Sequence, residues 1–282
     1  MESIFFAVSA LILAPLAGGL LSGIDRRITA RMQSRLGPPI LQAFYDVGKL
    51  FGKERLLVNR WQIVCCWVYF VAAALSVALF FAQADLLIIF FVQAAGAMFL
   101  VMGALSTRSP YSQVGAQREL IQILTYEPLL ILVFVGIYLE VGSFNVGEIM
   151  AYNTPLIQKL PLMFIVLSYA LTIKLRKSPF DFSTSHHAHQ ELVKGVLTEY
   201  SGPVLAVIEM AHWYETVLIL SVCALFWTTS WFWMIALLVA TYLVEIIIDN
   251  TMARMTWRWM LKYVWSIGLV LTFINFIWLH VR

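Results

Sequence analysis

The chain has 282 residues, of which 61% are hydrophobic and 12% are charged, and its formal net charge is +3. Soluble globular domains carry about 25% charged residues, so this composition excludes a soluble domain and indicates an integral membrane protein. The positive charges lie in stretches between apolar segments. They form no basic stripe interleaved with aromatic residues, which excludes a nucleic-acid-binding surface.

Eight segments are long and apolar enough to cross a membrane as helices, which takes about 20 residues each. They cover residues 4–23, 61–81, 86–105, 120–139, 156–173, 204–227, 231–248 and 263–281. The fifth has the shortest clean apolar run, because Lys159 and Pro161 interrupt its start. We therefore predict an all-α integral membrane protein with eight transmembrane helices. It forms a single polytopic membrane domain over residues 1–282, with no separate soluble domain.

Lysine and arginine are unevenly distributed between the two sides of the predicted bundle. All but two of the 19, Lys159 and Arg282, fall in loops 24–60, 106–118, 174–199 and 249–262. Because loops rich in these residues stay in the cytoplasm, we predict that these four loops are cytoplasmic. Both termini then lie on the non-cytoplasmic side.

The first of these loops contains an amphipathic pattern over residues 38–55. After two prolines, apolar residues recur at helical spacing, while Asp46 and Lys49 fall on the other side. This pattern predicts a lateral helix that lies in the plane of the membrane interface. The alternative interpretation is a surface helix that only seals the bundle.

The fourth span contains a carboxylate. Glu127 lies about 12 Å along the helix from Glu119, at about 1.5 Å per residue, and therefore inside the bilayer. The following Pro128 removes a backbone hydrogen bond and is expected to kink the helix, which is tolerated where the backbone lines a wet cavity. An ionisable residue in a span indicates a function. The alternative is a protonated or hydrogen-bonded packing residue.

The sixth and seventh spans add titratable residues at helical spacing. In the sixth, three such residues follow one another at about one-turn intervals beyond Glu199, and in the seventh two lie four apart on one face. Carboxyl groups inside a span can form a proton relay, because burial favours their neutral form. The sequence therefore predicts a proton pathway. Its residues are Glu127, Glu199, Glu209, His212, Glu215, Glu245 and Asp249.

The loop over residues 174–200 contains three histidines, His186, His187 and His189. Their spacing alone is weak evidence for a metal, and no carboxylate at a ligand-like offset completes a site. We therefore expect a docking or hydrogen-bonding role, with proton entry as an alternative. The three cysteines lie inside spans without a C-x-x-C pair, so we expect no iron–sulfur or structural zinc site.

Three blocks of sequence carry a family resemblance. They are RLGPPILQAFYDVGKLFGKE at 35–54, GAQRELIQILTYE at 115–127, and SPFD at 178–181 with ELVKGVLTEYSG at 191–202. At these blocks the chain resembles the membrane subunit of respiratory complex I that joins the membrane arm to the redox arm, called the H subunit in bacteria and subunit 1 in mitochondria. It is also similar to the counterparts in energy-converting membrane-bound nickel–iron hydrogenases. The resemblance covers essentially the whole chain.

Departures from complex I favour the hydrogenase branch, which includes the Ech-type, carbon-monoxide-linked and formate-hydrogenlyase complexes. Between the PFD and ELV motifs stands STSHHAHQ, with three histidines and no acid, where the quinone-reducing enzymes have a shorter, acidic stretch. The chain is also somewhat short for complex I. A further departure is His212, where the resemblance would place a glutamate.

The resemblance implies a non-catalytic subunit of a multisubunit membrane-bound nickel–iron hydrogenase in a prokaryotic plasma membrane. It would dock the redox arm and couple electron transfer to ion movement, with protons favoured over sodium. The implied partners are the soluble large and small hydrogenase subunits, an iron–sulfur subunit, an antiporter-like membrane subunit and the lipid bilayer. The nickel–iron centre and iron–sulfur clusters would belong to those partners, with no cofactor in this chain. The residues expected for loop structure and docking are Arg35, Asp46, Arg118, Asp181, His186, His187, His189 and Glu191.

Three other functions stay open on the sequence: the quinone-binding H subunit of NADH-quinone oxidoreductase, a purely structural membrane anchor, and an independent secondary transporter. An anchor does not need Glu127 or Glu209 in the membrane, where each costs about 3 kcal/mol. An independent transporter usually shows internal repeats with paired broken helices. The two halves of this chain show no convincing self-similarity.

Overall fold

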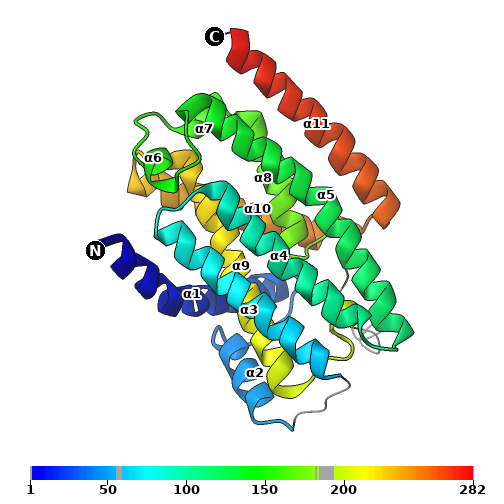
Figure 1. Cartoon of the computed structure of the whole chain (residues 1–282). Helices are drawn as coiled ribbons and strands as arrows, with labels where there is room; N and C mark the ends of the chain where they lie inside the picture. The colour runs from blue at the N-terminus through cyan, green and yellow to red at the C-terminus, as the bar shows by residue number, and fades with distance from the viewer. Residues whose placement is uncertain (1, 55–58, 182, 184–193, 282) are drawn as a thin grey trace.

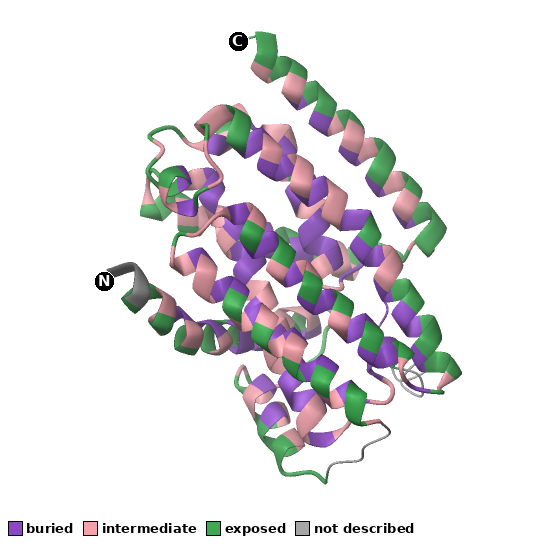
Figure 2. Cartoon of the chain, in the orientation of Figure 1, coloured by how far each residue is buried: buried purple, intermediate pink, exposed green. Residues whose placement is uncertain are grey.

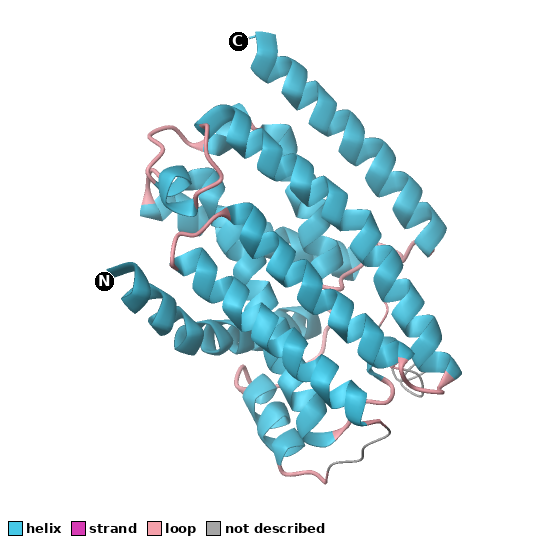
Figure 3. Ribbon diagram, viewed as in Figure 1, coloured by secondary structure: helices cyan, strands magenta, loops and turns pink. Residues whose placement is uncertain are grey.

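The computed structural model describes residues 2–54, 59–181, 183 and 194–281. Within these residues the regular structure consists of α-helices and two short 3-10 helices, η1 and η2 (Figures 1 and 3). The elements in chain order are α1 (Glu2–Met32), α2 (Gln42–Phe51), α3 (Arg60–Phe81), α4 (Leu86–Leu105), α5 (Pro110–Val141), α6 (Val146–Met150), α7 (Leu156–Lys159), α8 (Pro161–Lys174), η1 (Gly195–Leu197), α9 (Gly202–Ala224), η2 (Leu225–Trp227), α10 (Trp231–Thr251) and α11 (Trp257–Val281).

The predicted all-α membrane fold is confirmed. Seven of the described helices are long and apolar enough to span a bilayer: α1, α3, α4, α5, α9 with η2, α10 and α11. The predicted fifth span corresponds to α8, which has 14 residues. At about 1.5 Å per residue it is about 21 Å long, shorter than the roughly 30 Å hydrocarbon core. The count of eight therefore holds only when this short helix is included.

The most buried spans are α5 and α9, whose apolar segments are each 56% buried, whereas those of α1, α10 and α11 are each 22% buried. Figure 2 shows the same contrast, with exposed residues along much of α11. Because lipid replaces water around a membrane protein, the exposed apolar side chains of the outer helices are expected to face the bilayer. The charged residues described below lie inside this shell.

Several helices are longer than the predicted spans, and the extra residues lie at their polar ends. The first span was predicted to end at residue 23, but α1 continues to Met32, and the fourth was predicted to begin at 120, but α5 begins at Pro110. Hydropathy detects only the apolar part of a helix, and these extensions are polar turns of the same helices. α5 continues as one helix through Pro128, so this proline does not interrupt the span, and the expected kink stays a prediction.

The lateral helix α2 is shorter than the predicted range of 38–55. It covers only Gln42–Phe51, because the chain before it contains two prolines and Gly52 caps its end. Its inner face buries Ala43 and Val47 against α9. The ring of Phe44 packs edge-on against Trp213 of α9, with 5.1 Å between centroids. The helix therefore lies across one end of α9, as Figure 1 shows.

A buried amide of α11 caps the start of α8. The backbone N–H groups of Leu162 and Met163 donate to Oδ1 of Asn275, at 3.1 and 3.3 Å. Its Nδ2 atom donates to the carbonyl oxygen of Lys159 at 3.1 Å. The first N–H groups of a helix have no partner within that helix. Asn275 therefore satisfies, from another helix, the backbone groups exposed where α7 ends and α8 begins.

Replacing Asn275 with leucine should lower the free energy of unfolding by about 2–6 kcal/mol, because two buried N–H groups lose their acceptor at about 1–3 kcal/mol each. Thermal unfolding in detergent, followed by tryptophan fluorescence, would measure the loss. The matched control is Ser266→Ala on the exposed face of α11, which should change the unfolding free energy by less than about 0.5 kcal/mol. Equal unfolding temperatures for the two variants would contradict the capping role.

The loops predicted to share one side of the membrane do meet at one end of the bundle. Each of the four loops contacts at least one other through a hydrogen bond or an ion pair. These contacts are Asn59 to Ser106, Asp25 to Lys177, Gln33 to Asn250, and Pro179 to Met255. The basic loops therefore form one polar end, with α2 beside it.

Candidate ion-transfer site

The one-turn spacing of the acidic residues on α9 places them on a common cavity. Glu209, His212 and Glu215 line a cavity of about 730 Å³ together with Asp249 of α10. The cavity is bounded by α1, α9, α10 and the segment 174–178. The structure thus brings together four of the seven residues predicted for the proton pathway.

A second cavity, of about 290 Å³, lies under the lateral helix and shares Glu209 with the first. Asp46 of α2 lines it and forms an ion pair with Arg26 of α1 at 2.7 Å. Gln42 also donates to Asp46, at 2.9 Å. Partial burial by itself would raise the pKa of Asp46, but the hydrogen bonds from Gln42 and Arg26 outweigh it and hold the pKa below its usual value. Asp46 is therefore a fixed negative charge at this cavity.

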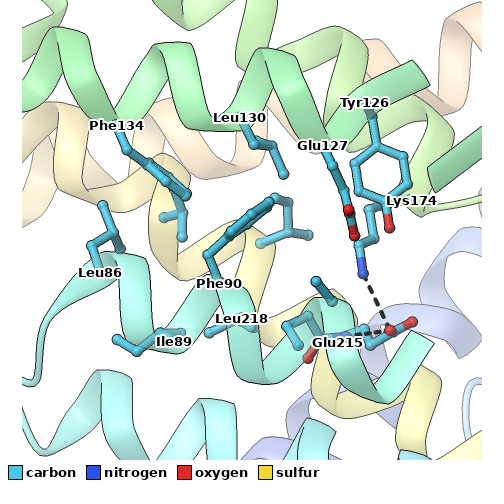
Figure 4. Close-up of a pocket in the computed structure, with 14 residues that line it drawn as sticks. Leu86, Ile89, Phe90, Tyr126, Glu127, Leu130, Phe134, Lys174, Glu215 and Leu218 are labelled. Carbon is cyan, nitrogen blue, oxygen red and sulfur yellow. Dashed lines mark hydrogen bonds and ion pairs between the residues drawn. The ribbon is translucent and has the colours of Figure 1, made fainter. Parts of the chain in front are cut away.

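A third, narrow cavity of about 40 Å³ extends from Glu215 to Glu127 (Figure 4). Its polar end contains Glu127, Tyr126, Lys174 and Glu215, while its remaining walls are mostly apolar. Glu215 and Lys174 also line the 730 Å³ cavity. The three cavities therefore follow one another with shared lining residues, Glu209 between the 290 and 730 Å³ cavities and Glu215 between the 730 and 40 Å³ cavities.

Three cations from the segment 174–177 each form an ion pair with a carboxylate of another helix. Nζ of Lys174 lies 3.2 Å from Glu215, and Nη2 of Arg176 lies 3.2 Å from Glu119. Lys177 approaches Asp25 of α1 at 2.9 Å. The side chains of Lys174 and Glu215 are each only 11% exposed. The sequence interpretation missed these partners, although the run KLRK after the fifth predicted span was the available signal.

Glu215 is the most strongly held of these carboxylates. Besides Lys174, the side-chain amide of Gln93 on α4 donates to it, and Tyr69 on α3 also hydrogen-bonds to it. Gln93 and Tyr69 were absent from the sequence prediction, because nothing in the sequence pairs these helices with the sixth predicted span.

The second and third motif blocks meet where α5 begins. Nε of Arg118 lies 3.8 Å from Oδ2 of Asp181, and the side-chain amide of Gln122 donates to the backbone carbonyl of Asp181 at 2.7 Å. Gly115 contacts η1 so closely that a Cβ atom there would overlap the backbone nitrogen of Val196. These contacts fix the described part of the 174–200 loop against α5.

The remaining predicted residues lie apart from the cavities. Arg35 is exposed and donates to Gln33. Glu199 is half-buried in the turn before α9, and Glu245 is 2% exposed on α10, where Thr172 hydrogen-bonds to it. Neither glutamate lines the three cavities, so their place in a pathway stays a prediction.

The histidine run falls outside the described residues, as do His186, His187, His189 and Glu191 individually. Among residues 2–54, 59–181, 183 and 194–281, no three His, Cys, Asp or Glu side chains are grouped to hold a metal ion. In the same part of the chain, Cys65, Cys66 and Cys223 are buried and form no disulfide.

Fold and site together define a multi-pass membrane protein with a network of acidic and basic side chains buried between its helices. The sequence profile of the NADH dehydrogenase family matches residues 5–280, and the chain belongs to this family. The resemblance drawn from the three motif blocks is therefore confirmed.

Two relatives from Escherichia coli (strain K12) are similar to this chain. Hydrogenase-4 component C is 34% identical over 227 residues, which cover 74% of this chain and 70% of the relative. Formate hydrogenlyase subunit 4 is 31% identical over 221 residues, covering 72% and 70%. The H subunit of NADH-quinone oxidoreductase from Dehalococcoides mccartyi (strain CBDB1) is 26% identical over 282 residues, covering 90% and 79%.

A solved structure shares the fold. It is a chain of the membrane-bound sulfane sulfur reductase, an archaeal respiratory membrane complex. The TM-score is 0.87, and the match covers 99% of this chain and 100% of the other, at 23% sequence identity.

Proposed function

We propose that this chain is the membrane subunit of a multisubunit membrane-bound hydrogenase, where it docks the soluble redox arm and transfers protons. The similarity to hydrogenase-4 component C and formate hydrogenlyase subunit 4 supports the type of complex. The observation that carries proton transfer is the series of cavities joined by shared carboxylates, first Glu209 and then Glu215. A prokaryotic plasma membrane is the expected location.

The residues of the series have distinct parts in this proposal. Asp46 and Arg26 set the charge at the outer cavity, and Glu209 receives protons from it. His212 lies between Glu209 and Glu215 on α9 and can accept or donate a proton at neutral pH. Glu215 then passes the proton to Glu127 across the narrow cavity. A carboxyl group that carries and releases a proton inside a low-dielectric span is costly to maintain, which supports a functional role over packing.

Docking belongs to the polar end of the bundle, where the basic loops meet. In this proposal that end faces the cytoplasm and both termini lie opposite, as the distribution of lysine and arginine indicates. The contacts of Arg118 and Asp181 hold the described part of the 174–200 loop in place for a partner. The histidine run would extend that surface. The lateral helix about 38–55 and the loop about 174–200 are then parts of one polytopic membrane domain.

The partners in this proposal are other subunits of the complex. The soluble large and small hydrogenase subunits and an iron–sulfur subunit would hold the nickel–iron centre and clusters. An antiporter-like membrane subunit would continue the ion path. In this proposal the residues of this chain supply binding, charge and proton exchange.

The proposal is tested by purifying the complex through an affinity tag on this chain and assaying it with an artificial electron donor. We expect hydrogen evolution from reduced viologen and co-purification of a nickel-containing subunit. A preparation in which the chain is stable alone, without redox subunits, would contradict the proposal and favour the anchor or the transporter.

A second candidate is the quinone-binding subunit of an NADH-quinone oxidoreductase. The H subunit from Dehalococcoides mccartyi aligns with 90% of this chain. The 730 Å³ cavity falls within the size range of small-molecule sites, about 300–1,000 Å³. Under this alternative the tagged complex would reduce a short-chain quinone with NADH and would evolve no hydrogen from reduced viologen.

A further inference from the structure

The charges around the narrow cavity do not balance. Two carboxyl groups, Glu127 and Glu215, line this cavity together with one cation, Lys174. Lys174 binds Glu215, whereas the nearby Arg176 binds Glu119, which does not line the cavity. Within the described part of the chain, no hydrogen-bond donor contacts the carboxylate of Glu127. A carboxylate without a hydrogen-bond donor inside a membrane span is unfavourable, so we expect Glu127 to hold a proton while Lys174 pairs with Glu215.

Lys174 is placed to serve either carboxylate. It is the last residue of α8, so its long side chain extends from a helix end into the cavity. Figure 4 shows this side chain passing beside Glu127, with its ammonium group linked to Glu215. The charge of Lys174 also acts on Glu127. The ring of Tyr126 lies 5.4 Å from the ammonium group and can stabilise it in passage.

We infer that Lys174 is a switch cation that pairs in turn with Glu215 and Glu127, so that the two carboxyl groups hold a single proton alternately. This inference rests on the proposed function and assigns a positioning residue to it. In one state of this switch Lys174 pairs with Glu215, as in the structure, and the proton is on Glu127. In the other state Lys174 pairs with Glu127, and Glu215 is the carboxylic acid. When the proton moves inward, the O–H bond of Glu215 breaks and one forms on Glu127. Lys174 stays an ammonium ion and crosses from Glu127 to Glu215.

The summed charge of Lys174, Glu127 and Glu215 is zero in both states, because one ammonium, one carboxylate and one carboxylic acid are present in each. The exchange therefore buries no new charge, and its main requirement is movement of one flexible side chain. The cavity volume of about 40 Å³ also admits a water molecule, which needs about 10–15 Å³, to carry the proton between the two carboxyl groups.

The alternative to a switch is a fixed ion pair, and Glu215→Gln separates the two. A glutamine cannot hold the ammonium group as a carboxylate does, so a free Lys174 should move to Glu127 and ionise it. In the complex purified through a tag on this chain, infrared spectra with perfusion of H₂O and D₂O buffers report protonated carboxyl groups. The band of Glu127 is assigned by its loss in Glu127→Gln. We expect that band to disappear in Glu215→Gln; its persistence would overturn the switch.

Two further variants keep the test sharp. Glu119→Gln removes the neighbouring carboxylate bound by Arg176 but leaves Lys174 with Glu215, so the Glu127 band should remain. Loss of the band in Glu119→Gln would show that any carboxylate change there ionises Glu127, and would overturn the specific role of Lys174. If Glu215→Gln fails to assemble, Glu215→Asp keeps the charge but shortens the side chain. It should reduce the band partially, and an unchanged band would overturn the inference.

These outcomes are independent of ion transport by the complex. A persistent Glu127 band together with a lost proton gradient in Glu127→Gln would reject the switch and leave the proposed proton pathway standing. The expected infrared result together with a normal gradient in Glu127→Gln would support the cation exchange and reject the pathway.

Discussion

Glu127→Gln and Glu209→Gln should each leave hydrogen evolution with an artificial donor close to the original rate, while proton translocation into sealed inverted vesicles falls by about two orders of magnitude. Glutamine keeps the shape and hydrogen-bonding capacity of glutamate but has no exchangeable proton. Glu209 joins the outer two cavities and Glu127 lines the inner one. A gap at either position therefore interrupts the series.

The measurement is a pH-sensitive dye in the vesicles, recorded beside the hydrogen evolution rate with and without an uncoupler. The matched control is Glu148→Gln on α6, an exposed glutamate that lines none of the three cavities. It should translocate protons normally. If Glu127→Gln and Glu209→Gln also build a normal gradient, the pathway through these residues is wrong. If both variants lose the redox subunits, the two carboxylates are structural and the anchor gains support.

The second large effect is expected for Gly115→Ala. A Cβ atom there would overlap the backbone of Gly195 and Val196, so η1 has to move away from α5. Backbone cannot rotate aside as a side chain can, and overpacking of this kind costs about 1–3 kcal/mol or more. The same movement would displace Gly195 and Val196 from the surface proposed for docking. We expect a lower unfolding temperature and loss of the soluble subunits from the purified complex.

Gly48→Ala is the matched control for this substitution. Gly48 lies within α2, and nothing is within 4 Å of a Cβ atom placed there. Alanine in a helix is favoured over glycine by about 0.5–1 kcal/mol, so this variant should be at least as stable as the parent. A Gly115→Ala complex with the parent's unfolding temperature and full subunit content would show that η1 accommodates the extra atom freely.

Local patterns predicted the parts of the site that depend on one helix. The spacing of Glu209, His212 and Glu215 is a property of α9 alone, and the structure places all three on one cavity. The amphipathic pattern around Asp46 likewise predicted α2. Such predictions need only the rise per residue and the number of residues per turn, which are the same in every α-helix.

The pairings between distant segments could not be predicted in the same way. Lys174 reaches Glu215 and Arg176 reaches Glu119 because α8 ends beside α5 and α9, which no periodicity encodes. The amide of Asn275 was missed for the same reason, since its partners lie more than 100 positions earlier in the chain. Hydropathy also does not detect polar helical turns, so the predicted spans omitted the polar C-terminal end of α1 and the polar N-terminal end of α5.

The short length of α8 also affects the electric field across the membrane. This helix is about 21 Å long, and the polar 730 Å³ cavity reaches its last residue, Lys174. A polar cavity conducts the potential of the adjacent aqueous phase inward, so the transmembrane voltage falls mainly over the apolar part that remains. One elementary charge moved through a full 100 mV corresponds to about 2.3 kcal/mol. If the voltage falls over a thinner apolar layer, a charge that moves a given distance through this layer crosses a larger fraction of the voltage. The same short movement of charge is then coupled to more of that energy.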